Sequence, residues 1–184
     1  SGIGLHTGKE ANVLITPDVP DSGITFIRSD LNENNLIKAI WTNVCSTILC
    51  TTIKNHHNIS ISTVEHLMSA LSGMHIDNAR IYINGPEVPI MDGSSKPFVE
   101  LIENAKIKEQ NYKRKIIKVL KEVEVSRKDS FVRLLPNKQF SVNFVIEFDS
   151  PIVNKQSCSL QLLNGNYKSD VSSARTFGFE KDVK

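Results

Sequence analysis

The sequence predicts an α+β chain built in two parts, with strands at its start, helices in its middle and strands again towards its end. Three observations lead to this prediction. Apolar residues alternate or run together in the first third, they return at helical spacing in the middle, and a run of basic residues then precedes a second group of strand-like segments. We place a domain boundary in this basic run, which gives an N-terminal part at residues 1–110 and a second part at residues 111–184.

The first third of the chain has the pattern of strands separated by turns. Residues 11–16 and 24–28 alternate or run apolar, and Asp21-Ser22-Gly23 supplies turn chemistry between them. Residues 47–53 are β-branched and apolar, which suits another strand. The polar segment Asn55-His56-His57-Asn58 then predicts a loop.

Two helices are predicted in the middle of the chain. The first, at residues 62–73, begins with Ser62 and Glu65 in the spacing of a capping box and has Gly73 as a stop. Its apolar residues fall on one face at helical spacing: Val64, Leu67, Met68 and Leu71. A strand at residues 79–84 and a turn at Asp92-Gly93-Ser94 follow. The second helix is predicted at residues 96–103 from its apolar residues Phe98, Val99, Leu101 and Ile102.

The second part begins within a run of seven basic residues, which are Lys106, Lys108, Lys113, Arg114, Lys115, Lys118 and Lys121. Such a run is usually a solvated linker or face, and the alternative is a patch that faces phosphate or a membrane. Strands resume at residues 116–125, 131–135 and 141–148. The stretch from Pro136 to Asp149 repeats the spacing of Pro17 to Asp30 with partly matching apolar positions. Two similar halves would produce this weak echo, and so would chance, because Pro after a strand is common.

Composition excludes several classes of protein. The chain has 184 residues, of which 40% are hydrophobic, enough for a packed core, and its net charge of +2 is too small to indicate a nucleic-acid partner. The three cysteines, Cys45, Cys50 and Cys158, do not form a disulfide framework, so we expect a reducing compartment. No apolar run reaches the roughly 18 residues of a transmembrane helix, and no basic-then-apolar leader is visible.

Glu65-His66 is the pair of residues with the clearest chemical use. A metal hydrolase needs a neutral imidazole as ligand and a carboxylate that takes a proton from water. The alternative for Glu65 is that it only completes the capping box. His66 lies about 160° from the apolar stripe of its helix, given about 100° per residue, so it is either plain surface or a side that a ligand approaches.

One histidine does not make a zinc site, because a catalytic zinc has three protein ligands. Cys45, Cys50, His56 and His57 can be drawn as a cluster of ligands, but their spacing matches no zinc ribbon or finger. The Gly-rich segment at residues 2–8 lacks the Lys-Ser/Thr end of a phosphate-binding loop, so a turn between strands is expected there.

Taken together, several segments resemble the UDP-3-O-acyl-N-acetylglucosamine deacetylases of Gram-negative bacteria, zinc-dependent enzymes of lipid A biosynthesis. The two most specific segments are Gly85-Pro86-Glu87-Val88-Pro89-Ile90-Met91-Asp92-Gly93-Ser94 and Ala174-Arg175-Thr176-Phe177-Gly178-Phe179. The others are Gly2-Ile3-Gly4-Leu5-His6-Thr7-Gly8, Leu49-Cys50-Thr51, Ser62-Thr63-Val64-Glu65-His66-Leu67 and Ile76-Asp77-Asn78-Ala79. They occur in the family's order and cover essentially the whole chain.

The resemblance implies a fold and a reaction. The fold is two α+β domains of similar topology, each a β-sheet layered with helices, with the active site between them and the second domain truncated in this chain. In the reaction, zinc and a glutamate activate water, which hydrolyses the N-acetyl group of UDP-3-O-acyl-N-acetylglucosamine in the committed step of lipid A biosynthesis. A cytoplasmic monomer is expected, with transient contact to the inner membrane and no nucleic acid bound.

The resemblance also assigns residues. Glu65 matches the general base, His66 the first Zn2+ ligand and Thr176 a hydroxyl donor to the tetrahedral oxyanion. Phe148 matches an aromatic residue that stacks on the uracil, with the acid Glu147 beside it. The positions that line the acyl-chain passage are matched by Ile48, Leu49, Cys50 and Phe177.

The chain departs from the family at its end. The family's other zinc ligands, a His and an Asp in a His-Lys-x-x-x-Asp pattern, and a later His that acts as general acid have no match up to Lys184. We therefore expect the chain to be the N-terminal portion of the deacetylase, inactive by itself, with its first strand trimmed before Ser1. The alternative is a truncated, non-catalytic module that binds a nucleotide sugar or a protein, and the reading frame beyond Lys184 distinguishes the two.

Overall fold

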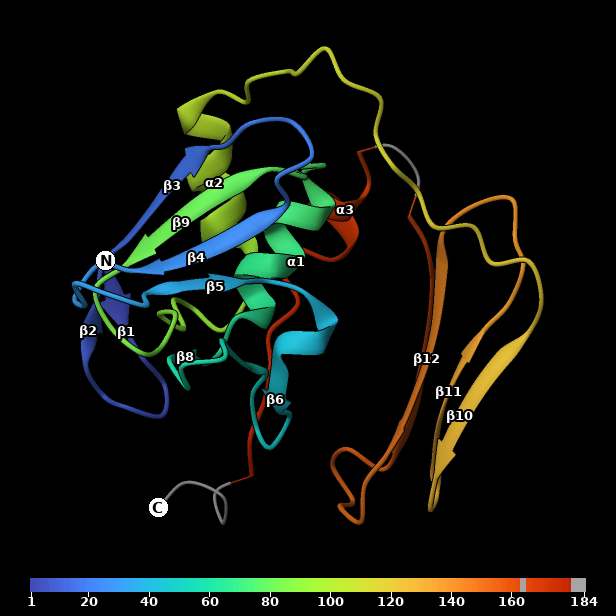
Figure 1. Ribbon diagram of the computed structural model, residues 1–184. Coiled ribbons are helices and arrows are strands. Elements are labelled where there is room, and N and C mark those ends of the chain that lie inside the picture. Colours follow the sequence, from blue (N-terminus) through green and yellow to red (C-terminus); the bar gives the residue numbers. More distant parts are fainter. Residues whose placement is uncertain (163–164, 180–184) are drawn as a thin grey trace. The chain divides into compact units, whose positions relative to one another are not determined.

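The computed structural model describes residues 1–162 and 165–179 and confirms the predicted α+β class (Figure 1). The chain divides into two compact units. The first unit is Ser1–Tyr112 together with the segment from Lys168 onward, and the second unit is Lys113–Tyr167. The predicted division into two similar α+β domains, at residues 1–110 and 111–184, concerns the complete protein and stays a prediction.

A four-stranded mixed sheet is the centre of the first unit. Its strand order is β3 (Val13–Pro17), β9 (Ala79–Ile83), β4 (Ile24–Arg28) and β5 (Leu36–Lys38). β9 pairs antiparallel with β3 and parallel with β4, whereas β4 and β5 pair antiparallel. A parallel pair needs a long crossover, and the crossover from β4 to β9 contains every element from β5 to α1.

Two helices cover one face of this sheet. They are α1 (Glu65–Gly73) and α2 (Lys96–Ala105), which contact each other and lie behind the strands in Figure 1. The core between the layers contains Phe26, Ile37, Ile81 and Ile83 from the sheet and Leu67, Leu71, Phe98 and Val99 from the helices. Burying one such side chain contributes about 1.5–3 kcal/mol, so this layer contact dominates the stability of the unit. The predicted apolar faces are confirmed, except that Leu101 is exposed and Met68 is only half-buried.

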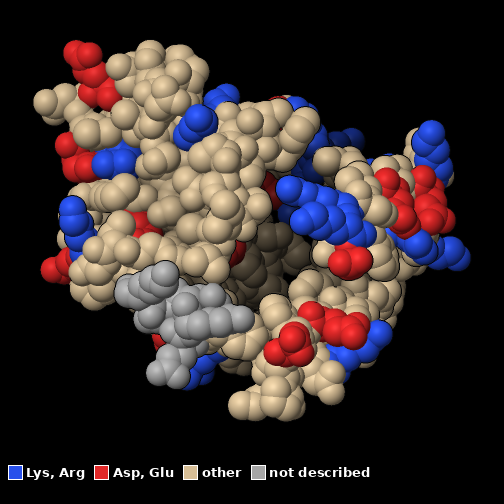
Figure 2. All heavy atoms as spheres, turned by 90° about the horizontal axis from the view of Figure 1, so that it is seen from below, with Lys and Arg blue, Asp and Glu red and all other residues tan. Residues whose placement is uncertain are grey.

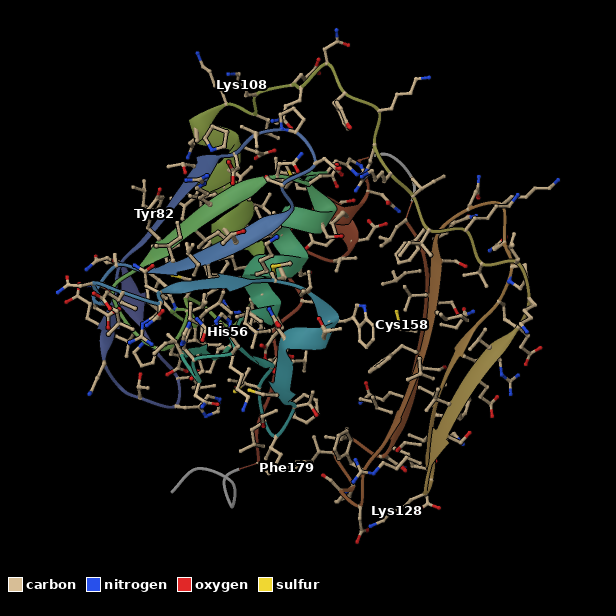
Figure 3. The ribbon with its side chains drawn as sticks, viewed as in Figure 1. His56, Tyr82, Lys108, Lys128, Cys158 and Phe179 are labelled. Atoms are coloured by element: carbon tan, nitrogen blue, oxygen red, sulfur yellow. The ribbon has the colours of Figure 1, made fainter. Side chains whose placement is uncertain are left out.

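Two smaller sheets complete the first unit. β1 (Gly2–Ile3) pairs with β2 (Glu10–Ala11). β6 (Val44–Ser46), β7 (Thr52–Lys54) and β8 (Ser60–Ile61) form an antiparallel three-stranded sheet, and a short 3-10 helix at Trp41–Asn43 precedes it. The predicted polar loop connects β7 to β8, and Figure 3 labels His56 within it.

The strand predicted at residues 47–53 is wrong in its first half. Residues 48–50 form a bend between β6 and β7, and Leu49 has a φ of 61°. A left-handed backbone at a residue other than glycine interrupts the extended conformation. The bend exposes Ile48 and Leu49 to 81% and 70% respectively, so these apolar side chains face solvent instead of the core.

The capping box predicted at the start of α1 is also wrong. α1 begins at Glu65, Val64 is its N-cap residue, and no side chain caps the helix. The Ser62 hydroxyl instead donates to the Pro86 carbonyl at 3.2 Å, and the Glu65 carboxylate accepts the Thr51 N–H at 3.0 Å. Partners that are distant in the sequence have replaced the local ones.

The second unit contains two antiparallel hairpins in its described part. β10 (Val123–Arg127) pairs with β11 (Ser130–Leu134), and β12 (Ser141–Glu147) pairs with β13 (Lys155–Gln161), a strand that the sequence pattern did not indicate. Residues 116–122 of the strand predicted at 116–125 lie outside helices and strands. All residues of the four strands are exposed apart from Ile146 and Leu160, which are half-buried. A short helix, α3 (Tyr167–Asp170), follows at the boundary between the units.

Charged side chains of both signs lie on the face that Figure 2 presents. Lys and Arg side chains adjoin Asp and Glu side chains there in several places. Lys108, from the basic run, lies on the segment that follows α2, outside the helices and strands (Figure 3). In the described residues, no helix has both the length and the apolar character needed to cross a membrane.

We predict that limited proteolysis cuts the second unit well before the first. The second unit exposes large apolar side chains, including those of Phe131, Val132, Phe144 and Val145, and its strands are almost entirely solvent-exposed. Local opening there costs little free energy, because few apolar contacts are lost. Brief trypsin digestion followed by mass spectrometry should leave a resistant product that ends near Tyr112. Equal protection of both units would contradict this expectation.

Candidate active site

The start of α1 presents Glu65 and His66 next to each other, and both are half-buried. Leu67 and Leu71 anchor the helix in the core, with at most 1% of either residue exposed. Glu65 and His66 do not lie on the core-facing side of the helix that Leu67 and Leu71 occupy, and part of their surface stays accessible. A rigid, well-packed helix therefore carries a carboxylate and an imidazole that a ligand can reach.

The Glu65 side chain joins α1 to the bend at residues 48–50. Its Oε2 accepts the N–H of Thr51 at 3.0 Å, and the N–H of Val64 donates to the Thr51 carbonyl at 3.4 Å. The structure thus brings the bend close to the start of the helix. Three of the expected acyl-chain residues lie there: Ile48, Leu49 and Cys50. The first two are exposed, and Cys50 is half-buried with its Sγ 3.8 Å from the Thr52 hydroxyl.

Thr176 is held beside the turn that contains Asp92 and Gly93. Its N–H donates to the Gly93 carbonyl at 2.9 Å, and Arg175 lies 3.5 Å from the Asp92 carboxylate. Asp92 in turn accepts the hydroxyl and the N–H of Ser94, at 2.7 and 3.0 Å. The Ser94 hydroxyl is the main reason that the pKa of Asp92 lies below 3.8; burial raises it, and the Ser94 N–H and Arg175 lower it further. Two sequence motifs that are distant along the chain therefore meet in the first unit.

The remaining predicted residues divide between the units. Phe177 is 54% exposed in the first unit, with its ring 5.8 Å from that of Phe179 in an edge-on arrangement. Glu147 ends β12 in the second unit, with its carboxylate 3.4 Å from Lys155 Nζ. Phe148 follows it, 39% exposed, and its N–H donates to the Asn154 carbonyl. Their expected role at the uracil stays a prediction.

Glu87 is a residue that the sequence reading did not single out for a role. It is only 1% exposed, yet both oxygens of its carboxylate accept hydrogen bonds. Oε1 accepts the N–H of His6 at 2.9 Å and the hydroxyl of Thr63 at 3.0 Å, and Oε2 accepts the N–H of Thr7 at 2.8 Å. An acidic residue next to the apolar run Val88-Pro89-Ile90 was the available signal, because a carboxylate there must find partners.

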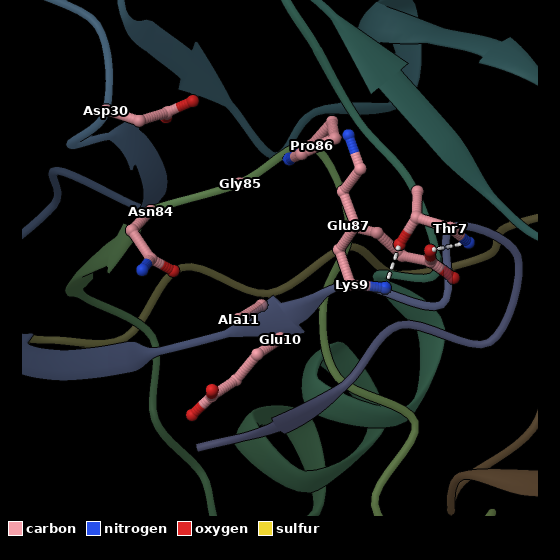
Figure 4. Close-up of a pocket in the computed structure, with 9 residues that line it drawn as sticks. All are labelled: Thr7, Lys9, Glu10, Ala11, Asp30, Asn84, Gly85, Pro86 and Glu87. Atoms are coloured by element: carbon pink, nitrogen blue, oxygen red, sulfur yellow. Dashed lines mark hydrogen bonds between the residues drawn. The ribbon is translucent and has the colours of Figure 1, made fainter.

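Burial and hydrogen bonding act in opposite directions on this carboxylate. Burial raises the pKa of Glu87, but the hydrogen bonds from His6, Thr7 and Thr63 outweigh it and hold the pKa below its ordinary value of 4.5. Glu87 is therefore a buried anion at neutral pH. It also lines a polar surface pocket (Figure 4) that is formed by Thr7, Lys9, Glu10, Ala11, Asp30, Asn84, Gly85, Pro86 and Glu87. This pocket does not include Glu65 or His66.

Within residues 1–162 and 165–179, no group of three or more His, Cys, Asp and Glu side chains is arranged to hold a metal ion. The alternative ligand cluster of Cys45, Cys50, His56 and His57 is therefore wrong. The rings of His56 and His57 instead contact each other, with centroids 3.9 Å apart and planes tilted by 46°. His66 is accessible enough to serve as one ligand of a metal ion, and one imidazole alone does not make a catalytic zinc site.

A carboxylate and an imidazole at an accessible helix start are groups that many hydrolases use to activate water. The comparisons with known proteins agree with this class. The model of the family described as LpxC, UDP-3-O-acyl N-acetylglycosamine deacetylase, matches residues 1–184. The chain therefore belongs to the UDP-3-O-acyl N-acetylglycosamine deacetylase family.

Curated relatives are similar along the whole chain. The UDP-3-O-acyl-N-acetylglucosamine deacetylase of Syntrophus aciditrophicus (strain SB) is 43% identical over 182 residues, which cover 99% of this chain and 58% of that protein. The protein of the same name from Legionella pneumophila (strain Corby) is 43% identical over 186 residues, which cover 100% of this chain and 61% of that protein. The chain thus spans about 60% of the length of these relatives.

We predict that Glu87 makes stability depend on pH in the acid range. Its pKa is lowered on folding, so its contribution is complete above the unfolded value of about 4.5 and is lost as the pH falls through the lower folded value. At pH 7, Glu87→Gln should lower the free energy of unfolding by roughly 2 kcal/mol, the scale of hydrogen bonds to a charged group. Urea denaturation at several pH values should show this difference shrinking below about pH 4.5.

Glu100→Gln is the matched control for this series. Glu100 lies on the exposed surface of α2, 3.9 Å from Lys96. Exposed pairs contribute about 0–1 kcal/mol, so this substitution should change stability little at pH 7. A difference between wild type and Glu87→Gln that stays constant from about pH 7 to about pH 3.5 would show that the Glu87 charge does not stabilise the fold.

Proposed function

We propose that the complete protein hydrolyses the N-acetyl group of UDP-3-O-acyl-N-acetylglucosamine, with zinc as its cofactor, in the committed step of lipid A biosynthesis. One observation carries the proposal: the family match extends over residues 1–184 and includes the Glu65-His66 pair at the start of α1. The relatives that align with 99–100% of this chain are UDP-3-O-acyl-N-acetylglucosamine deacetylases. A cytoplasmic monomer with transient contact to the inner membrane belongs to the same proposal.

In this proposal Glu65 is the general base and His66 is one ligand of the zinc. Bound zinc would polarise the acetamide carbonyl and lower the pKa of a water molecule. The Oε2 atom of Glu65 is already occupied by the Thr51 N–H, which fixes the carboxylate and leaves Oε1 to accept a proton from the attacking water. A base that is oriented in advance loses less entropy when the reaction occurs.

Thr176 is proposed to donate its hydroxyl to the oxyanion that forms when water adds to the acetamide carbonyl. Its backbone N–H is bound to Gly93, which fixes the residue while its side chain remains exposed. A donor that is aimed where negative charge develops typically contributes about 100- to 1,000-fold in rate.

Ile48, Leu49, Cys50 and Phe177 are proposed to contact the acyl chain, and Glu147 and Phe148 to contact the uridine. The exposure of Ile48, Leu49 and Phe177 supports the first assignment, because apolar side chains that face water are stabilised when a hydrocarbon covers them. The partial exposure of Phe148 supports the second, because an aromatic ring that is accessible can stack on a base.

We predict that Glu65→Gln and His66→Ala inactivate the complete protein in different ways. The amide introduced by Glu65→Gln would still accept the Thr51 N–H through its oxygen but would not take a proton. The kcat should therefore fall by about 100- to 10,000-fold while zinc content and melting temperature stay near wild type. His66→Ala should lower zinc content together with activity, because one of the ligands is lost. Melting temperature, zinc content and kcat are to be measured on the same samples.

Two substitutions outside the proposed site serve as controls. Glu100→Gln changes an exposed carboxylate on α2, and His56→Ala removes an exposed imidazole in the loop between β7 and β8. Both should retain turnover and zinc. If Glu65→Gln also kept wild-type turnover, Glu65 would only anchor Thr51 and its assignment as the base would be wrong.

A further inference from the structure

Glu87 has no part in the reaction as described above, although it is the most deeply buried carboxylate among the described residues. A charge that is removed from water persists only when its hydrogen-bonding capacity is satisfied. The partners of Glu87 come from two segments, one 24 residues away in the sequence and the other 80 and 81 residues away.

The first segment is the Gly-rich loop at residues 2–8. Both oxygens of Glu87 take part. Oε1 accepts the His6 N–H and Oε2 accepts the Thr7 N–H, and the Thr7 hydroxyl also donates a hydrogen bond to the carboxylate. Figure 4 shows Thr7 against the carboxylate in the pocket. Gly4 packs so closely that an added Cβ would lie 2.8 Å from Glu87 Cδ and 2.5 Å from Thr7 Oγ1. The loop is therefore built around this side chain.

The second segment is Ser62-Thr63, directly before α1. The Thr63 hydroxyl donates to Oε1, the Ser62 N–H donates to the Pro86 carbonyl at 2.9 Å, and the Val88 N–H donates to the Ser62 carbonyl at 3.0 Å. Thr63 is 2% exposed and has a φ of 57°. A β-branched residue takes this left-handed conformation only where its surroundings enforce it. Glu87 is the side chain that engages Thr63 in this position.

We propose that Glu87 is a positioning residue of the deacetylase site, which holds Thr63 in its left-handed conformation and thereby sets where α1 begins and where Glu65 and His66 point. The inference rests on the proposed function for its catalytic consequence. Glu87 is only 1% exposed and its pocket does not include Glu65 or His66, so we assign it an indirect role. It acts through Thr63, two residues before Glu65. Its hydrogen bonds with His6 and Thr7 also tie the Gly-rich segment at residues 2–8 to the residues before α1.

The test is Glu87→Gln in the complete protein, with two independent measurements. The amide keeps the size of the side chain but replaces one acceptor oxygen with a donor, so the N–H and O–H donors around it are no longer all satisfied. Hydrogen exchange should become faster both in peptides that cover residues 2–8 and in those that cover residues 62–71. Below the melting temperature, kcat should fall by about 10- to 100-fold with KM nearly unchanged, since a misplacement of about 1 Å can cost about 100-fold.

A second pair of variants keeps the test decisive if Glu87→Gln folds poorly. Thr63→Val has the same shape but lacks the hydroxyl, whereas Thr63→Ser keeps the hydroxyl. We expect Thr63→Val to show the same loss of kcat as Glu87→Gln, in smaller measure, and Thr63→Ser to remain near wild type. Two further variants serve as controls. Gly85→Ala changes the chain two residues before Glu87, where an added Cβ has no atom within 4 Å, and controls for a change in this segment. Ile37→Val removes one methylene from the core on β5 and controls for a loss of stability alone.

The outcomes separate this inference from the proposed function. The positioning role is supported if Glu87→Gln speeds hydrogen exchange in both segments and lowers kcat more than Ile37→Val does. Unchanged exchange at residues 62–71, or unchanged kcat with only a lowered melting temperature, overturns it. If wild type does not release acetate from the substrate, the proposed function fails, and the exchange measurement still decides whether Glu87 holds the start of α1.

Discussion

The side chain of Glu87 joins three parts of the first unit that are far apart in the sequence: the Gly-rich loop, the segment before α1 and its own strand-like segment. A buried anion tolerates little displacement of its donors, because each lost hydrogen bond leaves a charge without compensation. Displacing any of the three segments therefore costs stability. In our proposal, the same hydrogen bonds fix the start of α1, which carries Glu65 and His66.

The topology of the central sheet also determines where α1 and the bend at residues 48–50 lie. Because β4 and β9 are parallel, the chain between them must cross the sheet, and it does so through the β6–β8 sheet and α1. The crossover places the candidate base on a packed helix and the candidate acyl-chain residues on an exposed bend. The Thr51 N–H connects the two through Glu65. In our proposal, the packed helix serves the chemistry and the exposed bend contacts the hydrocarbon chain.

The segment from Lys168 onward shows how the first unit is completed after the chain has left it. Lys168 Nζ lies 2.7 Å from the Glu103 carboxylate, the Ser95 hydroxyl donates to the Ser172 carbonyl at 3.1 Å, and the Thr176 N–H donates to Gly93. Three contacts to α2 and the turn before it thus fix the Thr176 segment. The second unit interrupts the sequence between these parts, and its strands leave apolar side chains exposed.

The sequence by itself determined the α+β class, the strands at residues 24–28 and 79–83, both helices with most of their buried faces, and the family. These features depend on local periodicity or on motifs, which a single chain displays directly. Tertiary structure decided the bend at Leu49, the partner of Glu65 and the burial of Glu87. The last two depend on hydrogen bonds with distant segments, and the bend is followed directly by Thr51, whose N–H is bound to Glu65. Such partners outweigh local preferences because a buried polar group left without them is too costly.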